Sequence, residues 1–298
     1  MRWLAAGPGR YVAWMTTFSE APDNADAWPV QPRALIVTIY GLYAREAGGW
    51  LSVAALIRLM GELGVDEAAV RSSISRLKQR GVLEPRRQGG AAGYALSRLG
   101  RDILAEGDQR IFDRPRARPA DGWVLAVFSV PEAERRRRHA LRARLTWLGF
   151  GTVSAGVWIA PGHLAAETRD VLERAGLSGY VSLFRAEYLA FGDLREQVGR
   201  WWDTARLQDL YRAFLDAAGP VLARCAGDGA GDGAADGEAF ADYVRALTAW
   251  RRLPFLDPGL PAELLPDGWN GLRADEAFAA LRERLAGPAR AHVRAVSR

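Results

Sequence analysis

Hydrophobic residues recur at helical spacing in two segments near the start of the chain. In residues 33–47 they fall on nearly every side, which predicts a helix buried on two faces. In residues 53–63 they occupy one face, and Ser52 stands where a helix N-cap is expected. Gly64 then ends this second helix and leaves a short turn before residue 66. A further helix after that turn would complete the plan of a helix-turn-helix.

The third segment, residues 66–81, has the sequence DEAAVRSSISRLKQRG and reads as a capped amphipathic helix. Asp66 suits the N-cap, Gly81 suits the left-handed C-terminal position, and Val70, Ile74 and Leu77 share one face. The opposite face and its flank carry short hydroxyls, basic groups and one amide: Arg71, Ser72, Ser75, Arg76 and Gln79. Arg and Gln side chains make bidentate contacts to guanine and adenine. An ordinary amphipathic surface helix would show the same stripe, so the neighbouring segments must distinguish it from a DNA-reading helix.

Two extended runs, VLEPRR and YALS, flank a Gly-rich stretch after Gly81 and predict a β-hairpin. Arg86 and Arg87 lie near its tip, where we expect them to hold phosphates. Residues 66–101 contain eight Lys or Arg and three Asp or Glu, whereas the rest of the chain is balanced. A basic excess confined to one helix and one hairpin favours DNA. We therefore predict a winged helix-turn-helix over residues 32–113, with residues 66–80 in a major groove.

A linker and a domain of alternating strands and helices follow. The Pro-rich segment 114–121 predicts the linker. Beyond it, the pattern predicts strands at 123–130, 152–161 (with a bulge at Gly156) and 180–188, and helices at 132–148 and 163–175. This order predicts a ferredoxin-like α/β domain over residues 122–192. We expect it to contribute to a homodimer, and we interpret the four arginines 135–138 as a solvated helix face.

The remainder, residues 193–298, is predicted as a mainly helical domain. Helices are expected at 194–224, 238–252 and from 274 to 285 or beyond, with a mobile loop at 227–237 and an ordered irregular segment at 253–271. Residues 1–31 are predicted as a flexible extension, and either Met1 or Met15 fits the true start. The fold class is therefore α+β multidomain. One cysteine and no apolar run long enough to cross a membrane favour the cytoplasm.

Catalytic and metal-binding chemistry finds little support in the sequence. The three histidines lack metal-ligand spacing, and the strand ending at Ser129 and Val130 carries no carboxylate for a divalent metal. We expect neither an enzyme nor a metal or cofactor. Two alternatives stay open: a metal-dependent endoribonuclease-like enzyme, and a protein-interaction module that does not bind DNA. Salt-dependent DNA binding would separate the main prediction from the second alternative.

Three stretches resemble the phenylacetic-acid-degradation repressor family, PaaX, over residues 32–298. They are PRALIVTIYGLY with VRSSISRLKQRGVL, GWVLAVFSVPEAERRRRHALRARLTWLGFGTVSAGVWIAP, and WRRLPFLDPGLPAELLPDGWNG. The resemblance implies a cytoplasmic dimeric repressor of aromatic-acid (phenylacetate-type) catabolic genes. It also implies double-stranded operator DNA as partner, a middle domain similar to CRISPR-associated ribonucleases, and release by an aryl-CoA thioester. The effector-binding residues stay unknown. Aromatic and basic candidates are Trp123, Trp158, Arg185, Trp201, Arg251 and Arg252.

Overall fold

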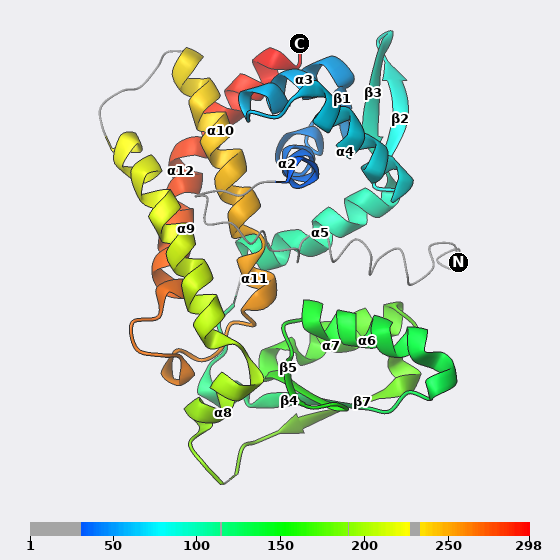
Figure 1. The fold of residues 1–298 in the computed structure, drawn as a ribbon, viewed down its shortest axis with the longest axis vertical. Coiled ribbons are helices and arrows are strands. Elements are labelled where there is room, and N and C mark those ends of the chain that lie inside the picture. The colour runs from blue at the N-terminus through cyan, green and yellow to red at the C-terminus, as the bar shows by residue number, and fades with distance from the viewer. Residues whose placement is uncertain (1–30, 114, 190, 227–232) are drawn as a thin grey trace. The chain divides into compact units, whose positions relative to one another are not determined.

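The computed structural model describes residues 31–113, 115–189, 191–226 and 233–298 (Figure 1). Its contacts divide the chain into two compact units. Unit 1 comprises the described residues of Asp113–Leu210 and Arg252–Asn270, and unit 2 those of 31–112, Tyr211–Arg251 and Gly271–Arg298. The predicted C-terminal domain, 193–298, is therefore shared between the two units. The expected extension at 1–31 lies outside the described residues except for Gln31.

Unit 2 begins with helices and a small sheet. Helix α2 (Pro32–Ile39) continues as a π-helical turn (Tyr40–Ala44), so the single helix expected over 33–47 ends earlier and changes its winding. Strand β1 (Trp50–Ser52) leads into α3 (Val53–Glu62) and α4 (Glu67–Gln79). The hairpin β2 (Leu83–Gln88) and β3 (Ala91–Leu96) precedes α5 (Arg98–Phe112). The three strands form an antiparallel sheet in the order β1-β3-β2, and the pairing of β1 is a feature that the sequence pattern did not reveal.

Helices from the end of the chain complete unit 2. They are α10 (Gly233–Trp250), most of α12 (Asn270–Val296) and the larger part of α9 (Thr204–Cys225). The Thr38 and Thr248 hydroxyls lie 2.7 Å apart, joining α2 to α10 in the buried interior. Because α10 begins at Gly233, the loop expected at 227–237 is wrong for residues 233–237. Its remaining residues, 227–232, lie outside the described part of the chain.

Unit 1 contains a four-stranded antiparallel sheet with two helices. Its elements are β4 (Trp123–Phe128), α6 (Arg135–Trp147), β5 (Gly151–Ser154), β6 (Val157–Pro161), α7 (Ala165–Arg174) and β7 (Val181–Ala186). The strand order is β5-β6-β4-β7. Alternate residues of β4, including Val124 and Ala126, enter a core with Leu141, Leu145 and Leu172 of the helices. The sheet therefore packs one face against α6 and α7.

The single strand predicted over 152–161 is wrong, because the segment folds into the hairpin β5–β6. The turn passes through Gly156, where a Cβ atom would lie 2.8 Å from the Phe128 carbonyl oxygen. The Gly156 carbonyl also accepts a hydrogen bond from Phe128 N–H at 2.9 Å. The bulge lies earlier, between Thr152 and Ser154.

The expected helix at 194–224 is broken into α8 (Leu194–Trp201) and α9. Trp202 takes an extended conformation at the break, and its indole Nε1–H donates to the Gly149 carbonyl at 2.8 Å. The irregular segment at 253–271 is ordered as predicted, since Leu260 and Leu265 are buried within unit 1. It includes α11 (Leu253–Leu256) and a 3-10 turn, Ala262–Leu264.

Candidate nucleic-acid interface

Helix α4 is held in place by local signals at both ends and by one buried stripe. The Asp66 carboxylate accepts a hydrogen bond from Ala69 N–H at 2.9 Å, which satisfies a donor of the first turn. Val70, Ile74 and Leu77 are buried. Gly81 follows the helix with a φ of +75°, a conformation that side chains disfavour. The prediction of a capped helix over 66–81 is confirmed.

The face of α4 opposite this stripe is open to solvent. Ser72, Ser75, Arg76 and Gln79 are all exposed. The Arg76 and Gln79 side chains have no hydrogen-bond or ion-pair partner among the described residues. Their donors are therefore available to an external partner without the loss of an internal bond.

Arg71, on the flank of this face, forms an exposed ion pair with Glu67 one turn earlier. Its Nε–H donates to Glu67 Oε1 at 2.7 Å, and a second guanidinium nitrogen lies 2.5 Å from the same oxygen. An exposed i,i+4 pair contributes only about 0.3–0.5 kcal/mol. Arg71 can therefore exchange Glu67 for a phosphate at small cost, but its charge is partly offset by this neighbour.

The hairpin β2–β3 turns through Gly89 and Gly90, whose φ values are +55° and +81°. Positive φ at both turn residues is typical of the tight turns that join antiparallel strands. Arg86 and Arg87 are both exposed and pair with Gly93 and Ala92 of β3. Because consecutive strand residues point to opposite faces, the two side chains present charge on opposite sides of the hairpin. Arg87 also donates to the Gly90 carbonyl at 3.1 Å.

Two residues that sequence reasoning missed fix the hairpin. The Trp50 indole N–H donates to the Arg86 carbonyl at 3.0 Å. A Cβ atom on Gly93 would lie 2.5 Å from Trp50 Cε2, so only glycine allows the indole to lie across β3. The available signal was a glycine inside a strand pattern, which marks a close approach of another group.

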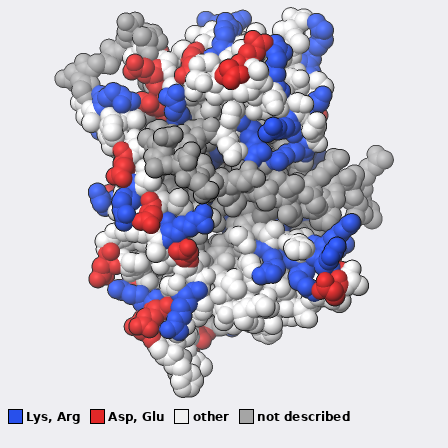
Figure 2. Space-filling model, in the orientation of Figure 1, with Lys and Arg blue, Asp and Glu red and all other residues white. Residues whose placement is uncertain are grey.

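Basic side chains also lie on the hairpin β2–β3 and on the helix beside it. In Figure 2, Lys and Arg side chains lie along the hairpin and the adjoining helix at the upper right of unit 2. They come from the segment in which the sequence places its localised positive excess. The structure therefore assembles the predicted residues of α4 and the hairpin on one compact unit.

The aromatic and basic candidates for effector binding are divided between the two units. Trp123 is buried beside Trp201, with ring centroids 5.8 Å apart, and Trp158 is buried in the core of unit 1. Arg251 belongs to unit 2, where it is buried and donates to the Ala34 carbonyl at 3.1 Å. Arg185 is exposed in unit 1. Burial lowers the pKa of Arg252, also in unit 1, and the nearby charge of Arg206 lowers it further.

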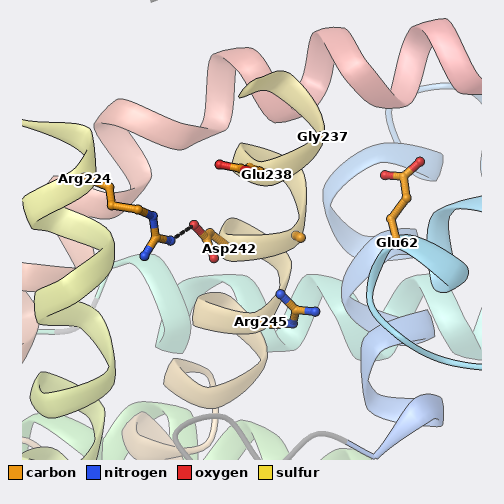
Figure 3. A pocket seen from close by; sticks show the side chains of 7 residues that line it. Glu62, Arg224, Gly237, Glu238, Asp242 and Arg245 are labelled. Atoms are coloured by element: carbon orange, nitrogen blue, oxygen red, sulfur yellow. Dashed lines mark hydrogen bonds and ion pairs between the residues drawn. The ribbon is translucent and has the colours of Figure 1, made fainter. Parts of the chain in front are cut away.

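A hollow of about 530 Å³ lies in unit 2 beside α3 and α10 (Figure 3). Its lining consists of Glu62, Arg224, Gly237, Glu238, Ala241, Asp242 and Arg245. Arg224 forms an ion pair with Asp242 at 2.5 Å, and His292 Nε2 lies 2.7 Å from Glu62 Oε2. With three carboxylates against two guanidinium groups, this lining does not favour a ligand of high negative charge, such as a CoA ester.

The described residues contain neither a cluster of metal-ligand side chains nor a helix that could span a membrane. Within residues 31–113, 115–189, 191–226 and 233–298, no three His, Cys, Asp or Glu side chains are grouped so that they could hold a metal ion. No helix in the same part of the chain is long and apolar enough to cross a membrane.

Comparison with known proteins places the chain in a family. The family model described as PaaX-like protein matches residues 31–100. The models for the PaaX protein central Cas2-like domain and the PaaX-like protein C-terminal domain match residues 116–198 and 202–295. Together the three models cover most of the chain, and the chain belongs to the PaaX family.

Two individual proteins are similar to the chain. The transcriptional repressor PaaX of Escherichia coli (strain K12) is 27% identical over 284 residues, covering 94% of this chain and 87% of the relative. Among solved structures, uncharacterized protein Rv0674 from Mycobacterium tuberculosis has 23% sequence identity and a TM-score of 0.46. That match covers 85% of this chain and 99% of the other.

Proposed function

We propose that this protein is a DNA-binding transcriptional repressor that reads an operator with helix α4. The observation that carries the proposal is the exposed, unpartnered face of a helix whose opposite stripe is buried, in a segment, residues 66–101, that has eight Lys or Arg against three Asp or Glu. In this proposal, α3, the short turn, α4 and the hairpin together form a winged helix-turn-helix. Family membership and the E. coli repressor support the same function.

In this proposal, four residues of α4 face base edges in the major groove and three arginines hold the backbone. The base-facing residues are Ser72, Ser75, Arg76 and Gln79, and the phosphate contacts are Arg71, Arg86 and Arg87. Side chains of these types can read base edges directly and can position the protein on the phosphate backbone. In this proposal the reading domain spans residues 32–113 and the middle domain residues 122–192, while residues 193–298 contribute to both compact units.

The middle domain supports assembly into a homodimer. Its elements follow the order β4-α6-β5-β6-α7-β7 along the chain and the strands the order β5-β6-β4-β7 in the sheet, which supports a ferredoxin-like fold. Two copies would place two α4 helices on half-sites separated by whole turns of DNA. The regulated genes are those of aromatic-acid catabolism, and an aryl-CoA thioester releases the DNA. These last two statements rest on the family resemblance.

Replacing Arg76 with alanine tests the proposal. The change should lower operator affinity by about 1–3 kcal/mol and relax preference at one base pair, if the guanidinium contacts a guanine. Gel-shift titration at several salt concentrations, against the operator and single-base variants, measures both effects. Arg294→Ala, which removes an exposed arginine from α12, is the matched control and should leave binding unchanged.

Salt dependence separates DNA binding from a role in protein docking. Binding that neutralises several phosphates weakens steeply as salt rises. An affinity insensitive to salt, or equal base selectivity in Arg76→Ala and wild type, would contradict the proposal that α4 reads the operator. A protein-interaction module would then be the better function for this unit.

A further inference from the structure

Helix α6 in unit 1 carries charge of a single sign. Its residues, Arg135–Trp147, include six arginines and no aspartate or glutamate. Helix α7, which packs on the same face of the sheet, has two arginines and three carboxylates. Because both helices belong to the same Arg-rich chain, the overall abundance of arginine does not explain the composition of α6.

This composition is unfavourable for the helix itself. Four of the arginines, residues 135–138, occupy the first turn, where the positive end of the helix dipole disfavours cations. Arg138 and Arg142 are four residues apart, a spacing at which like charges repel. A solvated helix face, the interpretation from the sequence alone, requires neither feature. Residues that oppose the stability of their own element are expected where function needs them.

Internal contacts account for only part of this charge. Arg138 donates to the Val130 carbonyl at 2.8 Å and to the Glu132 carboxylate at 2.9 Å, so it is held within unit 1. The Tyr180 hydroxyl donates to the Glu134 carboxylate. The two carboxylates that precede α6 are therefore bonded to these groups.

The other arginines include a row along the solvent face of α6. Arg135, His139 and Arg142 are exposed and follow one another at spacings of four and three, and Arg136 is exposed beside them. The opposite face, with Leu141, is buried in the core. From Arg135 to Arg142 the row extends about 10 Å along the helix axis. Figure 2 shows Lys and Arg side chains gathered on this right-hand side of unit 1.

The donors of this row are available to an external partner. The Arg135 and Arg136 side chains have no hydrogen-bond or ion-pair partner in the described part of the chain. The Arg142 guanidinium lies 5.9 Å from the centroid of the Trp158 ring. A contact with a ring face orients the guanidinium but does not use its N–H groups as hydrogen-bond donors to oxygen.

The surroundings of the row favour a phosphate-rich partner over a protein. None of the large hydrophobic side chains that are exposed in the described residues lies on α6. Protein interfaces have an apolar centre, whereas DNA-binding surfaces are polar and strongly positive. Duplex DNA carries one phosphate charge for about 1.7 Å of its axis, so a row of about 10 Å faces several phosphates.

We infer that Arg135, Arg136 and Arg142 of α6 form a second contact with duplex DNA, one that binds the phosphate backbone and reads no bases. The inference rests on the proposed function, in which DNA is the partner, and gives a role to a helix outside the reading domain. Guanidinium groups bind phosphate oxygens through paired N–H donors. Such contacts add affinity and position the protein, while sequence preference stays with the residues that reach base edges.

Neutralising the row in the full-length protein tests the inference. Arg135→Gln with Arg136→Gln, and a triple variant that adds Arg142→Gln, are compared with wild type by fluorescence anisotropy on a duplex of arbitrary sequence at several salt concentrations. The slope of log affinity against log salt should become shallower by about 1 for each arginine removed. At low salt the triple variant should bind about tenfold more weakly or worse.

Two further variants keep the result interpretable. Arg169→Gln with Arg174→Gln removes two exposed arginines from α7, with the same change in net charge as the α6 double variant, and should leave the slope unchanged. Arg135→Lys with Arg136→Lys keeps both charges and should keep the slope, because counterion release depends on charge. If the triple variant keeps the wild-type slope, or if the α7 variant loses as much as the α6 double variant, the α6 contact is wrong.

Base selectivity separates this inference from the proposed function. Duplexes that wild type selects from a random pool serve as operator, and the ratio of operator affinity to affinity for the arbitrary duplex measures selectivity. The α6 variants should keep this ratio, whereas Arg76→Ala should lower it. An unchanged slope in the triple variant with lowered selectivity in Arg76→Ala preserves α4 as the reader and overturns the α6 contact. A shallower slope in the triple variant with unchanged selectivity in Arg76→Ala preserves the α6 contact and overturns reading by α4.

Discussion

Gly93 is a position at which the structure leaves no room for a side chain. It lies in β3, opposite Ser52 of β1 and Arg86 of β2. A Cβ atom here would lie 2.3 Å from the Leu51 carbonyl oxygen, whereas real Cβ contacts essentially never fall below 3.0 Å. Gly93→Ala must therefore move backbone, because the obstructing oxygen belongs to a neighbouring strand.

The cost of this change follows from two contributions. Forcing an extra methyl group into a closely packed site costs about 1–3 kcal/mol. Displacing Trp50 also endangers its hydrogen bond to the Arg86 carbonyl, which contributes about 0.5–1.5 kcal/mol. Taking the middle of each range, we expect Gly93→Ala to lower the free energy of unfolding by about 3 kcal/mol. For a unit of this size that corresponds to a fall of roughly 5–10 °C in the melting midpoint.

Thermal melting followed by circular dichroism measures the effect, with Gly61→Ala as the matched control. Gly61 lies in α3 and is exposed, and a Cβ atom added there would have no neighbouring atom within 4 Å. The same substitution there should raise stability by up to about 1 kcal/mol, since alanine favours helix more than glycine does. A Gly93→Ala protein that melts with or above wild type would refute the close approach of β1, Trp50 and β3.

Other substitutions test individual bonds by urea denaturation. Asp66→Ala removes the N-cap of α4 and should cost about 1 kcal/mol, while Asp66→Asn should retain most of that stability; equal losses in both would contradict the capping role. Thr248→Val breaks the buried hydroxyl contact with Thr38 and should cost about 1 kcal/mol, and no loss would show that this contact adds nothing. Trp202→Phe leaves the buried Gly149 carbonyl without its indole donor and should cost about 1–3 kcal/mol, which an unchanged midpoint would disprove.

Local signals in the sequence are sufficient to predict α3, α4 and the residues at which they begin and end. Ser52 accepts a hydrogen bond from Ala55 N–H and Asp66 from Ala69 N–H, each in the first turn of its helix. Gly64 and Gly81 have the positive φ values expected of residues that end a helix. Caps and apolar stripes depend on residues a few positions apart, so they can be recognised without knowledge of the fold.

Features that depend on distant contacts could not be recognised in this way. Trp50 belongs to a strand only because β3, more than forty residues later, pairs with it. The break after α8 depends on the Trp202 indole reaching Gly149, 53 residues away in sequence. The pairing of Arg71 with Glu67, in contrast, joins residues four positions apart on one helix and can be predicted from the sequence alone.

Two of these distant contacts join α12, at the end of the chain, to α3 in the same unit as α4. His292 contacts Glu62, and the Val296 carbonyl accepts from Arg58 at 2.6 Å, so α12 is bonded to α3 at two points. Helix α3 directly precedes the turn that leads to α4. An effector changes DNA affinity only if it binds two arrangements of the protein unequally. Under the proposed function, a shift of α12 would be transmitted to α3 by these bonds. In that case the C-terminal helices would change DNA affinity without contacting DNA, because most of α12 belongs to the same compact unit as α4.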